Sequence, residues 1–190
     1  LKTDLADGRV RLNGAAFFYT YDNLQYQATD PEVFQGGVGN IPESEIMGVE
    51  LELGAFLTDS LMFDARLAWL DTEITSSHLA LDNVESEAAT NALLAQGIGL
   101  FSPDVEIARA GQITDVEGNE LAKTPSFTAN LALTYSSSIG SWGNFEGSLS
   151  YTHRGDFRHR IFNNPITDEV DSYDTIDLVL RFSPANANWR

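Results

Sequence analysis

The sequence predicts an all-β fold, an antiparallel β-barrel of the kind that crosses an outer membrane with strands. Apolar and polar residues alternate with a period of two in several long stretches, as they do on strands whose two faces meet different surroundings. Short turns and long excursions alternate between these stretches, which is the layout of an outer-membrane barrel. The acidic residues concentrate in the long excursions rather than being spread over the strands.

Composition narrows the possible functions. The 190 residues include 28 acidic and 11 basic ones, which gives a formal net charge of −17. Such a charge repels phosphate, so nucleic-acid binding is not expected. The chain has no cysteine, which excludes disulfides, thiol catalysis and cysteine-ligated zinc. No apolar run approaches the roughly 18 residues of a spanning helix, whereas a membrane strand needs only about 9–11 residues.

The first expected strand covers residues 9–27. The pair Asp7-Gly8 before it is typical of a hairpin turn. Val10 and Leu12 alternate with polar neighbours, but residues 15–19 are apolar on both parities. A bulge or a two-sided environment would explain that interruption.

The second and third strands, expected at 44–57 and 61–74, show the clearest alternation. In the second, Glu50 and Glu52 alternate with aliphatic residues, and the short link 58–60 leads to the third. Because successive strand side chains point to opposite faces, one face is apolar and the other carries carboxylates.

Three further strands are expected at 125–136, 144–158 and 172–183, which makes six in total. Each alternates leucines and aromatic residues with polar ones. The Ser/Gly-rich turn 137–141 joins the first two of these strands.

Long excursions at 28–43, 75–124 and 159–171 separate the hairpins. The glycines within 36–39 indicate a flexible loop, because they lack the strand-to-helix context and the following lysine of a phosphate loop. The excursion 75–124 is too long for plain coil. Helix-forming residues at 85–96 predict a short helix within it.

Four stretches, taken in order, resemble recurring strands of the TonB-dependent outer-membrane receptors. They are 8–25, 46–53, 118–135 and 173–178. The resemblance covers nearly the whole chain apart from its loops. It implies that residues 1–190 are part of the C-terminal half of a 22-stranded barrel with a plugged lumen. The plug domain, the energy-coupling box and the last barrel strands are expected to lie outside this sequence.

The resemblance also implies a function. Such a receptor takes up a scarce nutrient, namely siderophore-bound iron, haem, cobalamin or an oligosaccharide, by active transport across the outer membrane of a Gram-negative bacterium. The expected partners are the TonB-ExbB-ExbD complex, acting through the plug, a small-molecule or metal-chelate ligand, and outer-membrane lipid and lipopolysaccharide. No cofactor, enzymatic activity or nucleic-acid partner is expected.

The two parities of the strands are expected to meet different surroundings in such a barrel. The polar parity is expected to line the lumen or contact the plug: Glu50, Glu52, Asp64, Arg66, Asn130, Glu146, Ser148, Asp177 and Arg181. The apolar parity is expected to face lipid: Val49, Leu51, Leu53, Leu131, Leu133, Leu149, Leu178, Leu180 and Phe182. On the polar parity, Arg66 and Arg181 are expected to form interior ion pairs with the carboxylates.

One basic cluster begins at the end of the fifth strand and continues into the last long excursion. It consists of Arg154, Arg158, His159 and Arg160. Arginine suits planar carboxylates and phosphates, so we expect ligand contacts here. Lipopolysaccharide phosphates and the acidic neighbouring loops are alternative partners for these cations. No histidine stands in a metal-ligand spacing, so neither a metal site nor a catalytic residue is expected.

Three other classes of protein share parts of this pattern. A passive porin or specific channel has the same strands, but no plug domain precedes its barrel. A non-transport barrel is an adhesin or an outer-membrane enzyme, and the enzyme needs a nucleophile–base pair that is not apparent on these strands. A soluble β-sandwich is the third class, but its loops would not sort by length between its two ends.

Overall fold

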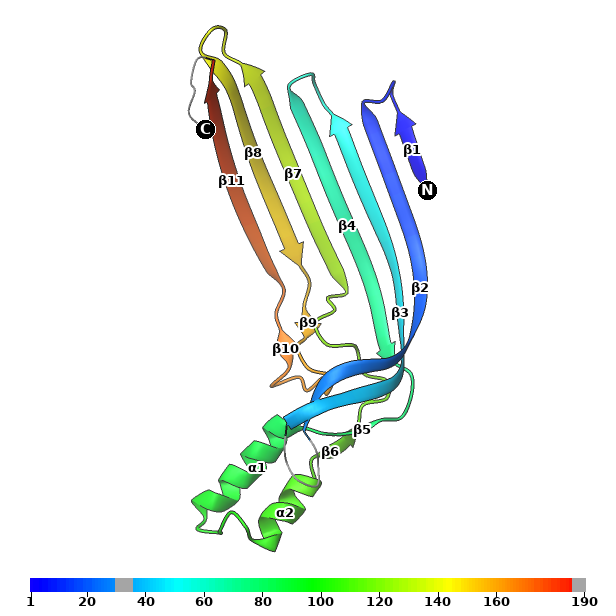
Figure 1. Cartoon of the computed structure of the whole chain (residues 1–190), viewed down its shortest axis with the longest axis vertical. Coiled ribbons are helices and arrows are strands. Elements are labelled where there is room, and N and C mark those ends of the chain that lie inside the picture. The colour runs from blue at the N-terminus through cyan, green and yellow to red at the C-terminus, as the bar shows by residue number, and fades with distance from the viewer. Residues whose placement is uncertain (30–35, 186–190) are drawn as a thin grey trace.

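A seven-stranded antiparallel sheet forms the body of the structure, a computed structural model that describes residues 1–29 and 36–185. The sheet follows the chain from β1 to β11, with β5, β6, β9 and β10 lying in the connections (Figure 1). Its strands are β1 (Lys2–Leu5), β2 (Val10–Thr29), β3 (Gly36–Phe56), β4 (Leu61–Ile74), β7 (Phe127–Ser138), β8 (Gly143–Arg154) and β11 (Tyr173–Pro184). The prediction of a mostly antiparallel β fold is confirmed, and the sheet of these residues is open, with β1 and β11 at its two edges.

The short turns at 6–9, 57–60 and 139–142 lie at one end of the sheet, which we call the turn end (Figure 1). The predicted Asp7-Gly8 turn is confirmed, since Ala6, Asp7 and Gly8 all have positive φ angles. Of the two explanations considered for residues 15–19, the structure contradicts the bulge, because β2 pairs with β3 without interruption from residue 10 to residue 22.

The long connections lie at the opposite end, the loop end, where one prediction was wrong. The excursion expected at 28–43 is largely strand, since β2 continues to Thr29 and β3 begins at Gly36. Gly36–Gly39 is therefore part of a ladder rather than a flexible loop. A Cβ at residue 39 would lie 2.6 Å from the Tyr26 ring of the opposite strand, so any other residue there would displace that ring. Residues 30–35 of this connection lie outside the described residues.

The strand expected at 144–158 is shorter than predicted, because β8 ends at Arg154. Gly155 follows, and its backbone N–H donates to the carbonyl of Phe127 at 2.8 Å. A Cβ at Gly155 would lie 2.9 Å from that oxygen, so the chain leaves the sheet where only glycine fits closely. The chain then forms β9 (Phe157–Arg158), which pairs with β10 (Glu169–Val170).

The excursion 75–124 contains two helices and two short strands. The expected helix is α1 (Asn83–Ala95), whose N-cap is Asp82. A second helix, α2 (Pro103–Ala110), was not predicted, although Ser102 caps it and proline stands in its first turn, both of which are helix-start signals. Between these helices and the sheet, β5 (Leu79–Leu81) pairs with β6 (Ile113–Asp115). Among the described residues, no helix is both long and apolar enough to cross a bilayer.

The hairpin of β2 and β3 bends sharply at the loop end (Figure 1). Asn23 has a φ of 56°, a left-handed conformation that asparagine tolerates better than most residues. The ladder passes from the Asp22–Glu43 pair to the Leu24–Ile41 pair and omits both Asn23 and Pro42, and Pro42 has no N–H to donate. We call the part beyond the bend, Leu24–Thr29 with Gly36–Ile41, the arm.

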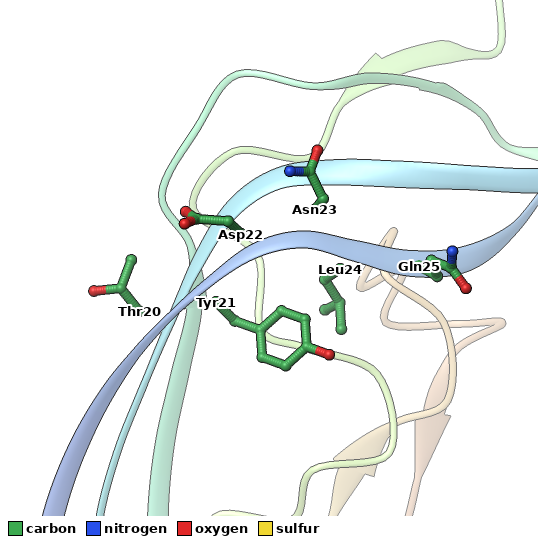
Figure 2. Close-up of a pocket in the computed structure, with 6 residues that line it drawn as sticks. All are labelled: Thr20, Tyr21, Asp22, Asn23, Leu24 and Gln25. Atoms are coloured by element: carbon green, nitrogen blue, oxygen red, sulfur yellow. The ribbon is translucent and has the colours of Figure 1, made fainter.

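The bend also interrupts the regular alternation of side chains between the two faces of both strands. Tyr21 and Leu24 lie three residues apart, yet their side chains point to the same side, while Asp22 and Asn23 point away (Figure 2). On β3 the same spacing separates Ser44 from Ile41, the register partners of Tyr21 and Leu24, and both are fully buried. The arm therefore turns its apolar side toward the connections at the loop end.

A small hydrophobic core lies at the loop end, where the arm meets the two long connections. It consists of Ile41, Ile74, Ala80, Val116, Leu121 and Ile161, with Leu24, Tyr26, Ile46, Ala122 and Phe162 packed against it. We call the arm together with residues 75–124 and 157–170 the cap. Ile46 and Ile74 have the same strand parity as Glu50 and Arg66, so the cap packs on the face of the sheet that carries these charges.

Candidate functional site

The register separates the two sets of predicted wall residues onto opposite faces of the sheet. Directly paired residues in antiparallel strands share a face, and Glu52 pairs with Arg66, which pairs with Asn130. Following the ladders places all nine residues of the predicted lumen set on one face, the polar face, and all nine of the predicted lipid set on the other, the apolar face. The alternation read from the sequence is thus preserved across five strands, β3, β4, β7, β8 and β11.

Interior ion pairing on the polar face is sparser than the sequence suggested. Arg181 pairs with Glu146 at 3.1 Å across β8 and β11. Arg66 lies directly opposite Glu52, but within the part of the chain that the structure describes its guanidinium has no ion-pair partner. Glu52 instead accepts a hydrogen bond from Asn13 at 3.1 Å. Arg66 is therefore a cation of the polar face that remains available to another segment.

The apolar face is strongly exposed near the edge strand β11. Leu178 and Leu180 are 65% and 63% exposed, and Phe182 is 50% exposed. An exposed apolar surface of this kind is typical of a face that contacts a membrane or another protein. Near the loop end the face becomes polar, where Asp174 accepts hydrogen bonds from Tyr151 and contacts His153, both at 2.7 Å.

The candidate site is a cavity of about 560 Å³ under the arm, between β2 and the segment that follows β9. It combines amides, cations and apolar side chains. Its lining consists of Gln25, Tyr26, Gln27, Ala28, Thr29, Gly36, Asn83, Ala122, Lys123, His159, Arg160, Ile161 and Phe162. This volume is typical of a site for a small molecule.

Two residues of the predicted basic cluster, His159 and Arg160, line this cavity, but Arg160 is already engaged. Its guanidinium contacts Asp82 and Asp168, each at 2.5 Å, and its side chain is only 15% exposed. Asp82 also caps α1, so Arg160 ties the start of that helix to the last connection. Burial disfavours the charge of Arg160, but the hydrogen bonds that it donates to Asp82 and Asp168, together with their negative charges, outweigh this effect and raise its pKa.

The other two arginines of the cluster do not line the cavity. Arg158 pairs with Glu169 at 2.7 Å, and this contact raises the pKa of Arg158. Arg154 lies over the ring of Phe157, 4.7 Å from its centre, and its Nη2 donates to the carbonyl of Lys123 at 3.5 Å. Acidic residues of neighbouring segments thus form ion pairs with Arg158 and Arg160. Pairing with the acidic loops was one of the alternatives that the sequence left open.

Polar contacts hold the walls of the cavity in place. Asn163 and Glu120 exchange two hydrogen bonds at 2.9 and 3.0 Å, and Asn119 donates to the carbonyl of Ile161 at 2.9 Å. On the arm, the hydroxyl of Tyr26 lies 2.9 Å from Nε2 of His78. Partial burial raises the pKa of Tyr26, which keeps this hydroxyl protonated. The cavity is therefore bounded by a pre-assembled framework.

Lys123 is the functional candidate that sequence reasoning missed. It lines the cavity and has a φ of 64°, an uncommon backbone conformation for a residue other than glycine. A usable signal was present, because Lys123 is the only lysine between residues 3 and 190 of an acidic chain. In the described residues, no three metal-binding side chains gather into a cluster.

Comparisons with known proteins agree with this geometry. The family model described as TonB dependent receptor-like, beta-barrel, matches residues 1–190. No curated protein matches the chain. Among solved structures, the siderophore receptor PiuA from Acinetobacter baumannii is similar, with 22% identity, a TM-score of 0.61 and coverage of 98% of this chain and 21% of that one.

Two further solved structures are similar at 16% identity. They are the ferric yersiniabactin uptake receptor FyuA from Yersinia pestis, with a TM-score of 0.59 over 94% of this chain and 20% of that one, and the ferric preacinetobactin receptor BauA from Acinetobacter baumannii, with a TM-score of 0.60 over 96% and 21%. The chain thus spans about a fifth of the length of the structures it matches.

Proposed function

Because the chain belongs to the TonB-dependent receptor-like β-barrel family, whose members lie in the outer membrane of Gram-negative bacteria, we propose that it is part of a receptor that imports a scarce nutrient. The observation that carries the proposal is the family match over all 190 residues, joined to a sheet with one polar and one apolar face. We propose that the apolar face meets lipid and that the polar face lines the lumen.

The position of the cap supports this orientation. Its hydrophobic core packs on the polar face through Ile46 and Ile74, so the long connections fold inward over the side that we assign to the lumen. A barrel must satisfy every backbone hydrogen bond within lipid. We therefore propose that segments beyond this sequence pair with β1 and β11 and close a wall of about 22 strands around a plug.

We propose a small metal chelate as the imported nutrient and TonB-ExbB-ExbD as the source of energy. The three similar structures are named as receptors for siderophores or their ferric complexes, and the cavity has the size of a small-molecule site. Binding, plug rearrangement and release into the periplasm involve no covalent chemistry, so we propose no enzymatic activity. Lipid and lipopolysaccharide surround the barrel.

Uptake of radioactive iron by cells that carry or lack the full-length gene tests the proposal. Iron is offered as a panel of chelates, in a strain with TonB and in one without it. We expect at least one chelate to be accumulated only when both the gene and TonB are present. Uptake that continues without TonB would favour the passive channel, and the absence of uptake for every chelate would contradict the receptor function.

A further inference from the structure

We propose that Lys123, rather than the arginines beside it, is the residue that binds the nutrient in the cavity under the arm, and that the nutrient is an anionic chelate with an exposed carboxylate or similar oxyanion. This inference rests on the proposed uptake function and specifies the charge of its ligand.

Backbone geometry at Lys123 is the first argument. Its φ of 64° lies in the left-handed region, which costs an ordinary residue about 1–2 kcal/mol. Arg154, the last residue of β8, and Arg158, in β9, hold it there. The N–H of Lys123 donates to the carbonyl of Arg158 at 2.6 Å, and its carbonyl accepts from Arg154 at 3.5 Å. Strained residues that the surrounding structure enforces cluster at functional sites.

The balance of charge around the cavity is the second argument. Arg160 is compensated by Asp82 and Asp168, so it adds no net positive charge to the wall. By contrast, the ammonium group of Lys123 has no hydrogen-bond or ion-pair partner within residues 1–29 and 36–185, and Lys123 is exposed. Lys123 is therefore the cation on this wall that is free to bind a ligand, with the exposed His159 beside it.

The other lining residues define the rest of the ligand. Gln25 and Gln27 line the cavity from the arm, where they alternate with Tyr26 along β2. Tyr26, Ile161 and Phe162 add apolar surface. Because lysine acts as a point charge rather than a planar fork, the site suits a single charged oxygen on a partly apolar chelate. It does not require the paired oxygens that an arginine binds.

Binding of three gallium(III) complexes to the purified full-length receptor tests the inference. The probes are the citrate complex and a tris-catecholate complex, both anionic, and the cationic complex of desferrioxamine B. We expect an anionic complex to bind and Lys123→Gln to weaken it by about ten-fold to a hundred-fold, while Lys123→Arg retains most of the affinity. Lys2→Gln, at the other lysine of the chain, is the matched control and should change nothing.

A second variant separates binding from folding. Lys123→Gly relieves the left-handed strain, so it should keep or raise the unfolding temperature and still lose affinity. Acylation of free amines, followed by peptide mass spectrometry, should show the anionic complex protecting Lys123 but not Lys2. Binding that is equal for all charges, or unaffected by Lys123→Gln, would overturn the inference and leave the uptake function standing. A receptor that binds none of the three complexes would also overturn the inference, and the iron-uptake panel would then decide the proposed function separately.

Discussion

Arg160 joins two long loop-end connections that are far apart in the sequence, because it contacts both Asp82 and Asp168. Removing its charge leaves Asp82 and Asp168 without a counter-ion in a site where Asp168 is fully buried. We expect Arg160→Met to destabilise the cap by about 3–5 kcal/mol, the usual effect of breaking a buried ion pair from one side. Proteolysis of the full-length receptor in membranes should then cut within α1 or residues 160–168.

The matched control for this change is Arg9→Met at the turn end. Arg9 pairs with Asp59 at 3.0 Å, but the two side chains are 47% and 95% exposed. Such a surface pair contributes about 0–1 kcal/mol. Equal protease sensitivity of the two variants would contradict the structural role that we assign to Arg160.

The lowered pKa of Asp115 predicts that the stability of the cap depends on pH. A hydrogen bond from Ser77, followed by those from the backbone of His78 and Glu117, lowers the pKa of Asp115 below its ordinary 3.8. A lowered pKa means that the stabilising contribution is present above pH 3.8 and is lost as the pH falls through the pKa of the folded state. Asp115→Ala should therefore speed hydrogen exchange in β5 and β6 at neutral pH, and this difference from the wild type should shrink in strong acid.

At the scale of single residues, the basic cluster predicted from the sequence includes two residues that line the cavity, His159 and Arg160, but not Lys123, the residue that we favour. Arg154, Arg158 and Arg160 stood out because they lie within seven residues of one another in an acidic chain. Which of them is neutralised depends on Asp82 and Glu169, and Asp82 comes from another connection. Such pairings depend on tertiary packing, which the local sequence does not contain.

The bend of the β2–β3 hairpin depends on one backbone conformation. Asn23→Val places a β-branched residue at a φ of 56°, which such residues strongly disfavour. We expect a loss of about 1–2 kcal/mol or more, and Asn23→Gly should be neutral or stabilising. Thermal unfolding of the full-length receptor measures both, and equal unfolding temperatures for the two variants would show that the bend does not need a left-handed residue.

At the scale of elements, the wall strands could be predicted and the loop end only in part. The strand expected at 61–74 matches β4 at both ends, because two environments impose a strict alternation on the wall. The arm was not predicted because the alternation of apolar and polar residues is interrupted at Asn23 and Pro42. The helix α2 was missed despite its Ser102 cap, since eight residues carry little periodic signal.

At the scale of the whole molecule, the orientation of the sheet can be tested with two adjacent residues. Leu178 lies on the apolar face and Val179 on the polar face, and both are more than half exposed. A lysine on a lipid-facing strand costs about 2–4 kcal/mol at the bilayer midplane. We therefore expect Leu178→Lys to impair assembly of the full-length receptor and Val179→Lys to be tolerated.

The readout is the heat-modifiable band of outer-membrane extracts on a gel run with and without boiling. A wild-type barrel should shift on heating, the Val179→Lys variant should shift in the same way, and the Leu178→Lys variant should show less folded band. The reverse result would mean that the face with Val179 meets lipid and the face with Leu178 lines the lumen. If neither lysine affects assembly, the contact of this edge with lipid is contradicted.

The break at Asn23 and Pro42 separates the register of the wall from the length of the hairpin beyond it. The pairing of β2 with β3 from residue 10 to residue 22 is complete before the break, and the arm beyond it follows an alternation of its own. A segment inserted beyond the break does not change which side chains of the wall lie on each face. An insertion in the arm would therefore leave the wall in register, but it would disturb the contacts that Leu24, Tyr26 and Ile41 make with the core of the cap.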